Sequence, residues 1–308
     1  MLRTKASTQI LFHNLIFGGR SKHTLMKRLA FILLLITNAI YAQKGKIKHV
    51  IIIGVDGMSP DGVMKAHSPN MDTLMAHGSH SFECKAQLPT VSSPNWASII
   101  MGVPPAAHGI WSNKWQVRDI KDSVYCNGKK GHIFPTIFRV LREQKHHAKI
   151  MCFAGWWSFV RLVEPGVCTA KERTLWTGLV SSRAVTSVKL RKPDLLFIDL
   201  NDVDETGHKY GHGTPEYYKA VSEADVVVGR IMRAVKKAGI ENSTAIMIIA
   251  DHGGIGHGHG GTTPQEINVP FIIAGPGIKK GYTLKANPRN YDTTVTVAKM
   301  LGLTIPAC

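Results

Sequence analysis

Several features that mark common classes of protein are absent from this 308-residue sequence. It contains no internal repeat, no low-complexity tract apart from a Gly/His-rich stretch at 253–261, and no apolar run long enough for a comfortable membrane span. Its five cysteines include no Cys-x-x-Cys pair, and their odd number leaves at least one thiol unpaired, while the pairing of the others stays open. Neither a long basic helix nor an aromatic-interleaved basic strand is present, so nothing indicates a nucleic-acid-binding module.

Acidic residues are scarce: 21 Asp and Glu stand against 38 Lys and Arg, which gives a net charge of +17. The first 42 residues hold six of the basic side chains and no acidic one, so a chain that begins at Gln43 carries +11. The remaining positive charge is dispersed in short pairs, namely Lys129-Lys130, Arg191-Lys192, Lys236-Lys237 and Lys279-Lys280. Such a surface favours anionic substrates through electrostatic steering but does not specify nucleic acid.

The N-terminal region has the layout of a secretory signal peptide that begins at Met26 rather than at residue 1. Lys27 and Arg28 form a basic start, an apolar stretch follows at 29–36, and Ala42 precedes the expected cleavage site. We therefore interpret residues 1–25 as an upstream artefact, residues 26–42 as a signal peptide, and residues 43–308 as a secreted or periplasmic protein with one catalytic domain. An uncleaved N-terminal anchor is the alternative.

Apolar strand-like runs alternate with helical stretches from Lys46 onward, which predicts an α/β fold: a doubly wound, mostly parallel central sheet with helices on both faces. The expected strands are His49–Val55, Lys149–Phe153, Leu195–Asp199, Ala245–Ala250 and Val269–Ala274. The expected helices are Pro69–His77, Pro94–Met101, Pro135–Gln144, Pro215–Ala238 and Tyr291–Leu301, and most begin with proline. The segments 111–130 and 156–192 fit neither period, so we expect small irregular insertions over the site there.

Carboxylate and imidazole side chains follow three of these strands, at the sheet edge where parallel α/β folds bind ligands. They are Asp56 after the first strand, Asp204 and His208 after the third, and Asp251, His252 and His259 after the fourth. The set contains more ligands than a single ion needs, and mixed Asp/His ligation suits zinc-like ions. Two neighbouring ions form a clamp for phosphoryl transfer, so the sequence predicts a two-metal hydrolase.

Three hydroxyl side chains, those of Thr90, Ser92 and Ser93, precede the expected helix at Pro94. At a helix N-terminus, backbone N–H groups and the helix dipole favour a phosphate, and bonding to a metal ion is a recognised way to activate serine. Ser92 or Ser93 can also serve simply as the helix N-cap, and both roles can hold together. A lone Asp at a strand end is likewise often a turn residue, so the prediction rests on the whole set.

Several motifs in order, GVDG, LPTVSSPNW, GVPPAAHGI, DVDETGHKYGHGTPEY and ADHGG with the later GHGG and VPFIIAGPG, resemble the alkaline phosphatase superfamily. Within it they are most similar to the type I phosphodiesterase/nucleotide pyrophosphatase branch, from about His49 to Gly277. The resemblance implies two zinc ions, one bound by Asp56, Asp251 and His252 and the other by Asp204, His208 and His259. It also implies that Ser92 is the nucleophile, that a covalent phospho-enzyme forms on it, and that Asn95 helps to hold a phosphoryl oxygen.

The sequence departs from that branch at three points. Ser92 stands where the diesterases usually have threonine, Trp96 stands where histidine is frequent, and the chain is short for the branch. An alkaline phosphatase-like phosphomonoesterase is therefore the alternative, and it would need an extra cation beside the nucleophile. The candidate cations are Arg118, Arg139, Arg161 and Arg173. His257 is the alternative to His259, which we favour because it lies in the HGG that resembles the last ligand motif of the family.

Two further readings are disfavoured. A sulfatase of this superfamily needs an arginine two residues after the motif proline, and Pro94 is followed by Asn95 and Trp96. A non-catalytic metal- or polyanion-binding relative would not need Ser92. The expected partner is thus a small phosphate-ester or nucleotide substrate. Five tryptophans could supply a stacking surface for a base, although ordinary packing is favoured for most of them: Trp96, Trp111, Trp115, Trp156 and Trp157.

Overall fold

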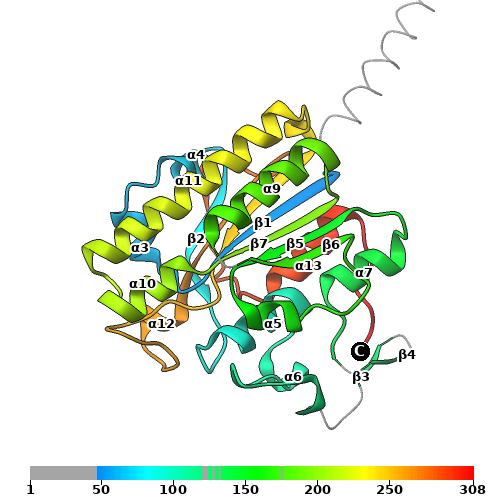
Figure 1. Cartoon of the computed structure of the whole chain (residues 1–308), viewed down its shortest axis with the longest axis horizontal. Helices are drawn as coiled ribbons and strands as arrows, with labels where there is room; N and C mark the ends of the chain where they lie inside the picture. Colours follow the sequence, from blue (N-terminus) through cyan, green and yellow to red (C-terminus); the bar gives the residue numbers. More distant parts are fainter. Residues whose placement is uncertain (1–46, 120–123, 127–128, 132, 175) are drawn as a thin grey trace, which may run out of the picture. The chain divides into compact units, whose positions relative to one another are not determined.

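The computed structural model describes residues 47–308, except for 120–123, 127–128, 132 and 175 (Figure 1). The predicted upstream segment at 1–25 and the predicted signal peptide at 26–42 both lie outside these residues. Within the described residues, no helix combines the length and the apolar character that crossing a membrane requires.

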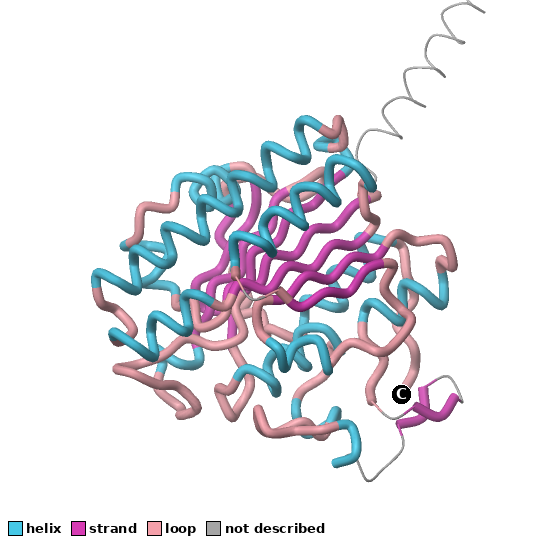
Figure 2. Tube along the Cα trace, in the orientation of Figure 1, coloured by secondary structure: helices cyan, strands magenta, loops and turns pink. Residues whose placement is uncertain are grey.

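An eight-stranded sheet forms the centre of the domain, in the order β10-β2-β9-β8-β1-β7-β5-β6 (Figure 2). Its parallel part comprises β8 (Thr244–Ile249), β1 (His49–Val55), β7 (Leu195–Leu200), β5 (Ile150–Ala154) and β6 (Ala170–Arg173). The rest comprises β9 (Asn268–Ala274), antiparallel to both β8 and β2 (Gly78–Lys85), and the edge strand β10 (Tyr282–Thr283). A separate hairpin is formed by β3 (Val124–Cys126) and β4 (Lys129–Gly131).

Helices cover both faces of this sheet, which confirms the predicted doubly wound α/β architecture (Figure 1). One face carries α3 (Pro60–Lys65), α4 (Pro69–Ala76), α9 (Thr177–Arg191) and α11 (Pro215–Lys237). The other carries α5 (Ser92–Met101), α7 (Ile137–Gln144) and α13 (Asp292–Leu301). The shorter helices are α6 (Pro105–His108), α8 (Trp157–Arg161), α10 (Asp202–Tyr210), α12 (Pro264–Ile267) and the 3-10 turns η1 (Val117–Asp119) and η2 (Glu241–Ser243).

The central strands are apolar on both faces because a layer of helices covers each face of the sheet. In β1, Ile52 pairs with Phe197 of β7 on one side and with Met247 of β8 on the other, and all three side chains are buried. Continuous β-branched and other apolar runs of this kind are typical of parallel strands buried on both faces. The polar residues that follow β1, β7 and β8 are thereby brought to one edge of the sheet.

Strand β9 contains a proline although it has neighbours on both sides. Pro270 cannot donate a backbone hydrogen bond, and such a residue is normally confined to edges or irregular positions of a sheet. The register between β9 and β2 shifts between Ser81 and Cys84, opposite Pro270, so the ladder is interrupted where the N–H group is missing. The reversal of β9 is not visible in the sequence, because hydrophobic periodicity does not report strand direction.

All five predicted strands and all five predicted helices are present, with ends shifted by at most two residues. The prediction that 156–192 is irregular was wrong, since this segment contains α8, β6 and the 15-residue α9. The buried face of α9 combines Val180 and Val188 with the small or polar residues Ser181, Ala184 and Ser187, so the apolar period is weak. The cysteine pairing that the sequence left open is a disulfide between Cys126 and Cys308.

Candidate metal centre and active site

Three strand ends deliver the predicted carboxylates to one place. Asp56 directly follows β1, Asp251 follows β8 by one residue, and Asp204 lies in the first turn of α10, just after β7. Gly57 makes the sharp turn after β1 with a positive φ of 67°, and a Cβ there would lie 2.7 Å from the Asp204 side chain. The Gly57 N–H donates to Asp251 Oδ1 at 3.2 Å, so the turn also holds the third carboxylate.

The first group of candidate ligands is Asp56, Asp251 and His252, which are fully buried. His252 Nε2 lies 3.5 Å from Asp56 Oδ1 and 3.2 Å from Asp251 Oδ2. Neither of these two carboxylate oxygens has a hydrogen-bond partner within the described chain. The other oxygen of Asp56, Oδ2, accepts a hydrogen bond from Trp96 Nε1 at 3.2 Å. The unpartnered oxygens and the imidazole nitrogen therefore face one another.

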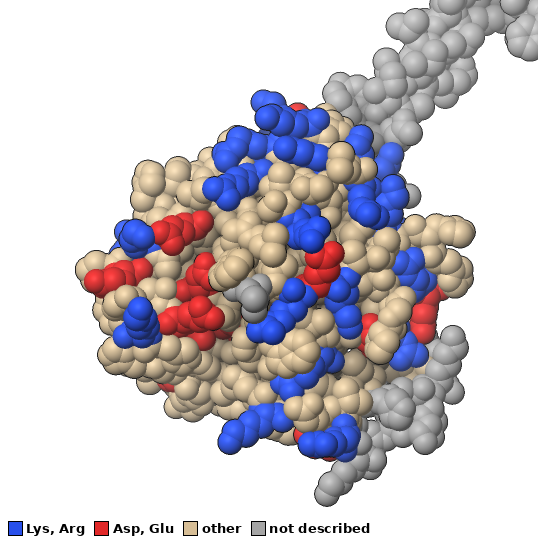
Figure 3. Space-filling model, in the orientation of Figure 1, with Lys and Arg blue, Asp and Glu red and all other residues tan. Residues whose placement is uncertain are grey.

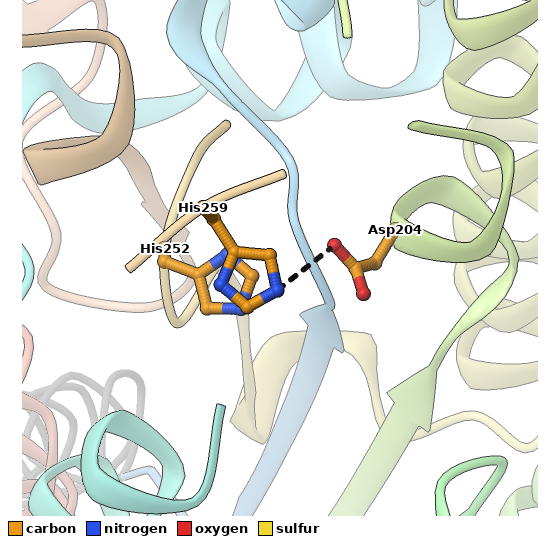
Figure 4. A group of neighbouring side chains, drawn as sticks. All are labelled: Asp204, His252 and His259. Atoms are coloured by element: carbon orange, nitrogen blue, oxygen red, sulfur yellow. Dashed lines mark ion pairs between the residues drawn. The ribbon is translucent and has the colours of Figure 1, made fainter. Parts of the chain in front are cut away.

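The second group of candidate ligands combines Asp204, His252 and His259 (Figure 4). His259 Nε2 lies 3.8 Å from Asp204 Oδ1, and the His252 and His259 rings stack with their centroids 3.7 Å apart. The predicted ligand His208 joins from the solvent side, with Nε2 at 3.2 Å from Asp204 Oδ2. The six predicted ligands thus lie together, and His252 belongs to both groups.

Three imidazoles are oriented in the same way. Nδ1 of His252 lies 2.8 Å from the Gly253 carbonyl oxygen, Nδ1 of His259 lies 2.8 Å from that of Thr90, and Nδ1 of His208 lies 2.9 Å from that of His257. A carbonyl oxygen can only accept, so Nδ1 carries the proton in each neutral ring. Nε2 is then the lone-pair nitrogen, and in each ring it faces the carboxylates, as in metal-ligating histidines.

The electrostatics of this cluster favour a bound cation. Burial, followed by repulsion from neighbouring carboxylates, raises the pKa of Asp56 and of Asp251 well above the ordinary value. Burial also lowers the pKa of His252 well below its ordinary value, so this imidazole does not supply the missing positive charge. Buried anionic oxygens without partners are costly unless a metal or a charge compensates them. The donor set therefore fits zinc or a neighbouring transition metal.

Ser92 is the hydroxyl that faces the candidate metal ligands. It is the first residue of α5, it is buried, and its Oγ lies 3.1 Å from His252 Nε2. Thr90, by contrast, uses its Oγ1 to donate to the Gly261 carbonyl at 2.8 Å. The Ser93 hydroxyl is buried without a partner in the described structure. Among the three predicted hydroxyls, Ser92 is therefore the one that the geometry favours as nucleophile.

The predicted contact between Asn95 and a phosphoryl oxygen needs correction. Asn95 is completely buried, and its Oδ1 accepts from the Gln87 N–H at 2.6 Å and from Asn290 Nδ2 at 2.7 Å. Its Nδ2 lies 3.0 Å from each of the carbonyl oxygens of Gln87, Pro89 and Val91. The amide is thus fully occupied, and Asn95 positions the loop that carries Ser92.

A different asparagine, Asn113, lies beside the nucleophile. Its Oδ1 accepts from the Ser93 N–H at 2.8 Å, and its own carbonyl accepts from Arg161 Nη2 at 3.0 Å. Asn113 Nδ2 has no hydrogen-bond partner among the described residues. Little in the sequence pointed to this residue, because Asn113 stands in the aperiodic segment after α6 and meets Ser93 only through the tertiary fold.

A further histidine, His212, was also missed by the sequence reasoning. Its Nε2 lies 3.9 Å from Asp204 Oδ1, and neither ring nitrogen has a hydrogen-bond partner in the described structure. Burial lowers the pKa of His212 to about 4. His257, the alternative to His259, is exposed and places Nδ1 3.1 Å from the His208 carbonyl, at the rim of the site. The geometry therefore favours His259 over His257.

The tryptophans near the site divide between core and surface. Trp96 and Trp115 are buried, whereas Trp111 and Trp157 are 53% and 57% exposed. The Trp96 ring packs edge-on against Phe159 and fills the space beside Gly54, while its Nε1 reaches Asp56. Trp96 therefore joins the hydrophobic core to the candidate metal centre, whereas Trp111 and Trp157 are surface residues.

Comparisons with known proteins identify a family that this chain matches. A family model described as type I phosphodiesterase/nucleotide pyrophosphatase matches residues 50–257. An uncharacterized pyrophosphatase/phosphodiesterase of Schizosaccharomyces pombe is 23% identical over 228 residues, which cover 66% of this chain and 44% of that protein. A bis(5'-adenosyl)-triphosphatase of Xenopus laevis is 24% identical, with 66% of this chain and 46% of that protein covered. The chain thus spans less than half the length of these relatives.

The fold has a close counterpart among solved structures. Murine ectonucleotide pyrophosphatase/phosphodiesterase 5, solved as an inactive variant in complex with AMP, superposes with a TM-score of 0.68. The sequences are 14% identical, and the superposition covers 84% of this chain and 96% of that one. At this level of identity the likeness concerns the fold.

Proposed function

Because the chain belongs to the type I phosphodiesterase/nucleotide pyrophosphatase family, we propose that it is a two-zinc hydrolase of phosphodiester or pyrophosphate bonds. The observation that carries the proposal is the position of Ser92, whose Oγ lies 3.1 Å from Nε2 of His252, the residue shared by both ligand groups. One relative is named for its action on bis(5'-adenosyl) triphosphate and one neighbour was solved with AMP, which supports nucleotide-type substrates.

The chain's own residues supply the ligands and the nucleophile. One ion would be held by Asp56, Asp251 and His252, and the other by Asp204, His208 and His259. When bound, the ions supply Lewis-acid chemistry that favours the serine alkoxide and offsets charge on the phosphoryl oxygens. The alternative of a non-catalytic relative leaves Ser92 without a role.

The reaction begins at Ser92. Its Oγ loses a proton to solvent and attacks phosphorus in line, while the bond from phosphorus to the leaving oxygen breaks. A phosphoserine or nucleotidyl-serine ester remains, and a water molecule then attacks phosphorus and releases the Ser92 hydroxyl. Asn113, which is oriented by its bond to the Ser93 N–H, donates from Nδ2 to a phosphoryl oxygen and takes the role first expected of Asn95.

The four candidate arginines differ in their surroundings. Arg161 Nη2 is engaged with the Asn113 carbonyl and with Ser158 Oγ, so it supports Asn113. Arg139 pairs with Glu143, and the Arg173 guanidinium lies 5.3 Å from the Trp157 ring centroid. Arg161 Nε is buried without a hydrogen-bond partner in the described structure, and Arg118 is exposed. Because both partners of Arg161 Nη2 are neutral, this guanidinium keeps its charge beside Asn113, and a phosphomonoesterase stays the alternative to a diesterase.

A paired assay tests the proposal on purified protein from residue 43 onward, loaded with zinc or stripped by a chelator. We expect zinc-dependent hydrolysis of para-nitrophenyl thymidine 5′-monophosphate to exceed that of para-nitrophenyl phosphate. Ser92→Ala should abolish turnover with unchanged metal content, and the matched variant Ser92→Thr, which keeps a hydroxyl, should retain it. Preference for the monoester would move the protein to the phosphatases, and turnover by Ser92→Ala would refute the nucleophile.

We also propose that the protein is exported by the signal peptide at 26–42. The support is the sequence layout described above, together with family members that are named as venom enzymes or ectoenzymes. N-terminal sequencing of the protein secreted by expressing cells is expected to begin near Gln43. A secreted product that begins before Met26 would contradict the assignment of residues 1–25 as an artefact.

A further inference from the structure

A groove of about 280 Å³ lies between α9 and α11 and is lined by none of the candidate metal ligands. Lys189 from α9 and Arg230, Arg233 and Lys237 from α11 contribute to its lining. The end of α9 lies a few residues before β7 begins, and the end of α11 lies shortly before β8 begins. The groove is therefore near the amino edge of the parallel sheet, whereas the metal ligands stand at the carboxyl edge.

The charge of the groove is of one sign. The four cations that line it have no acidic neighbour in the lining, and none of them forms an ion pair within the described chain. Arg183, which is on α9 but outside the groove, does pair with Glu172 at 3.2 Å. Figure 3 shows Lys and Arg side chains gathered over this part of the surface. The groove thus collects unpaired positive charge.

Helix-end electrostatics explain only part of this arrangement. Lys189 and Lys237 lie in the last turns of α9 and α11, where the helix dipole favours cations. Arg230 and Arg233 lie earlier in α11, outside the reach of that effect. They project from the face of α11 that meets α9. Arg233 follows Arg230 by three residues and precedes Lys237 by four, a spacing that places side chains on one side of a helix.

A buried hydroxyl adds a neutral donor to the groove. Ser181 belongs to the lining, is 1% exposed, and its Oγ has no hydrogen-bond partner in the described structure. A helical serine ordinarily bonds to the carbonyl four residues earlier or to water, and a buried hydroxyl without a partner costs about 1–3 kcal/mol. An oxygen-bearing ligand in the groove would satisfy this group.

We propose that the α9–α11 groove is a binding site for a phosphate group, separate from the metal centre. Two guanidinium groups present paired N–H donors that match phosphate oxygens, the two lysines add charge, and Ser181 Oγ donates to an oxygen of the ligand. The same chemistry would recognise free phosphate, a soluble phosphate ester or the headgroup of an acidic phospholipid. The proposal is independent of the reaction at Ser92.

Isothermal titration with inorganic phosphate tests the site on the metal-loaded protein. We expect a binding event that persists after chelation, whereas phosphate binding at the metal centre is lost. Arg233→Gln should weaken the persistent event about tenfold and Ser181→Ala about threefold. Lys236→Gln is the matched control, because Lys236 is exposed on α11 but does not line the groove. Equal affinity in all three variants and the wild type, or no persistent event, would overturn the proposal.

A second arm of the experiment identifies the source of the phosphate group. Vesicles of phosphatidylglycerol with phosphatidylcholine are compared with phosphatidylcholine alone in a sedimentation assay. Binding to the acidic vesicles that Arg233→Gln loses and Lys236→Gln keeps supports a lipid headgroup. Titration with phosphate but no sedimentation supports a soluble phosphate compound. Sedimentation weakened equally in both variants would show diffuse charge attraction and contradict a built site.

Discussion

Replacement of Asn95 by alanine separates a positioning role from contact with substrate. Three buried groups would lose their partner, namely the N–H and the carbonyl of Gln87 and the Nδ2 of Asn290. The carbonyls of Pro89 and Val91 would keep another donor. At about 1–1.5 kcal/mol for each of the three unsatisfied groups, the lower part of the usual range, we expect the free energy of unfolding to fall by roughly 3–5 kcal/mol. For a domain of this size, Tm should fall by roughly 10 °C.

The measurement is urea and thermal unfolding of metal-loaded wild type and variants, followed by turnover at a temperature where all are folded. Asn290→Ala is the matched control, and it should cost only about 1 kcal/mol because Asn95 Oδ1 keeps the Gln87 N–H. Suppose instead that Asn95→Ala is as stable as the wild type but loses about a hundredfold or more in turnover. Asn95 would then hold a phosphoryl oxygen as first predicted, and the correction made from its hydrogen bonds would be refuted.

Three further predictions concern the metal centre and the core. Trp96→Phe removes the donor to Asp56 Oδ2, and chelator competition should show metal affinity reduced about tenfold or more. Unchanged affinity would show that Trp96 does not help to orient Asp56 for metal binding. In metal-stripped protein, burial raises the pKa of Asp56, so the folded state retains a proton that the unfolded chain releases. The free energy of unfolding, measured in urea, should therefore fall as pH rises above about 4. A free energy of unfolding that does not change with pH would contradict this. Burial lowers the pKa of His108 to about 4 from 6.5, so its contribution to the free energy of unfolding is fully present above pH 6.5. About 3 kcal/mol of that free energy is lost as pH falls towards 4. His108→Gln should make the free energy of unfolding depend less on pH over this range.

The part of the site that lies next to regular strands could be predicted from the sequence. The apolar runs of β1, β7 and β8 predicted three strands of a mostly parallel sheet, and the residues that follow such strands lie at one edge. The structure adds that the three strands are neighbours. Asp204 and His208, four residues apart, needed only the helix α10 to face the same ion. These inferences depend on local spacing, which a single sequence contains.

The remaining part depends on contacts between distant segments. Asn113 reaches Ser93 from an aperiodic loop, and His212 reaches Asp204 because Gly207 and Gly254 leave room for its ring. Asn95 shows the opposite error: its proximity to Ser92 in the sequence suggested contact with substrate, whereas its side chain turns towards the loop 87–91. Proximity along the chain did not predict the direction of the Asn95 side chain. That direction depends on the backbone groups that need hydrogen-bond partners.

The loop that carries the nucleophile and the loop that carries the last histidine ligand fix each other. Thr90 accepts from His259 Nδ1 through its carbonyl, accepts from the Gly260 N–H through its hydroxyl oxygen, and donates from that hydroxyl to Gly261. Ser92 is only two residues away. A displacement of Thr90 would therefore move the nucleophile and reorient a metal ligand together. Because these bonds involve only protein groups, the chain itself orients Nε2 of His259 towards Asp204, so the metal centre is built around ligands whose direction is already set.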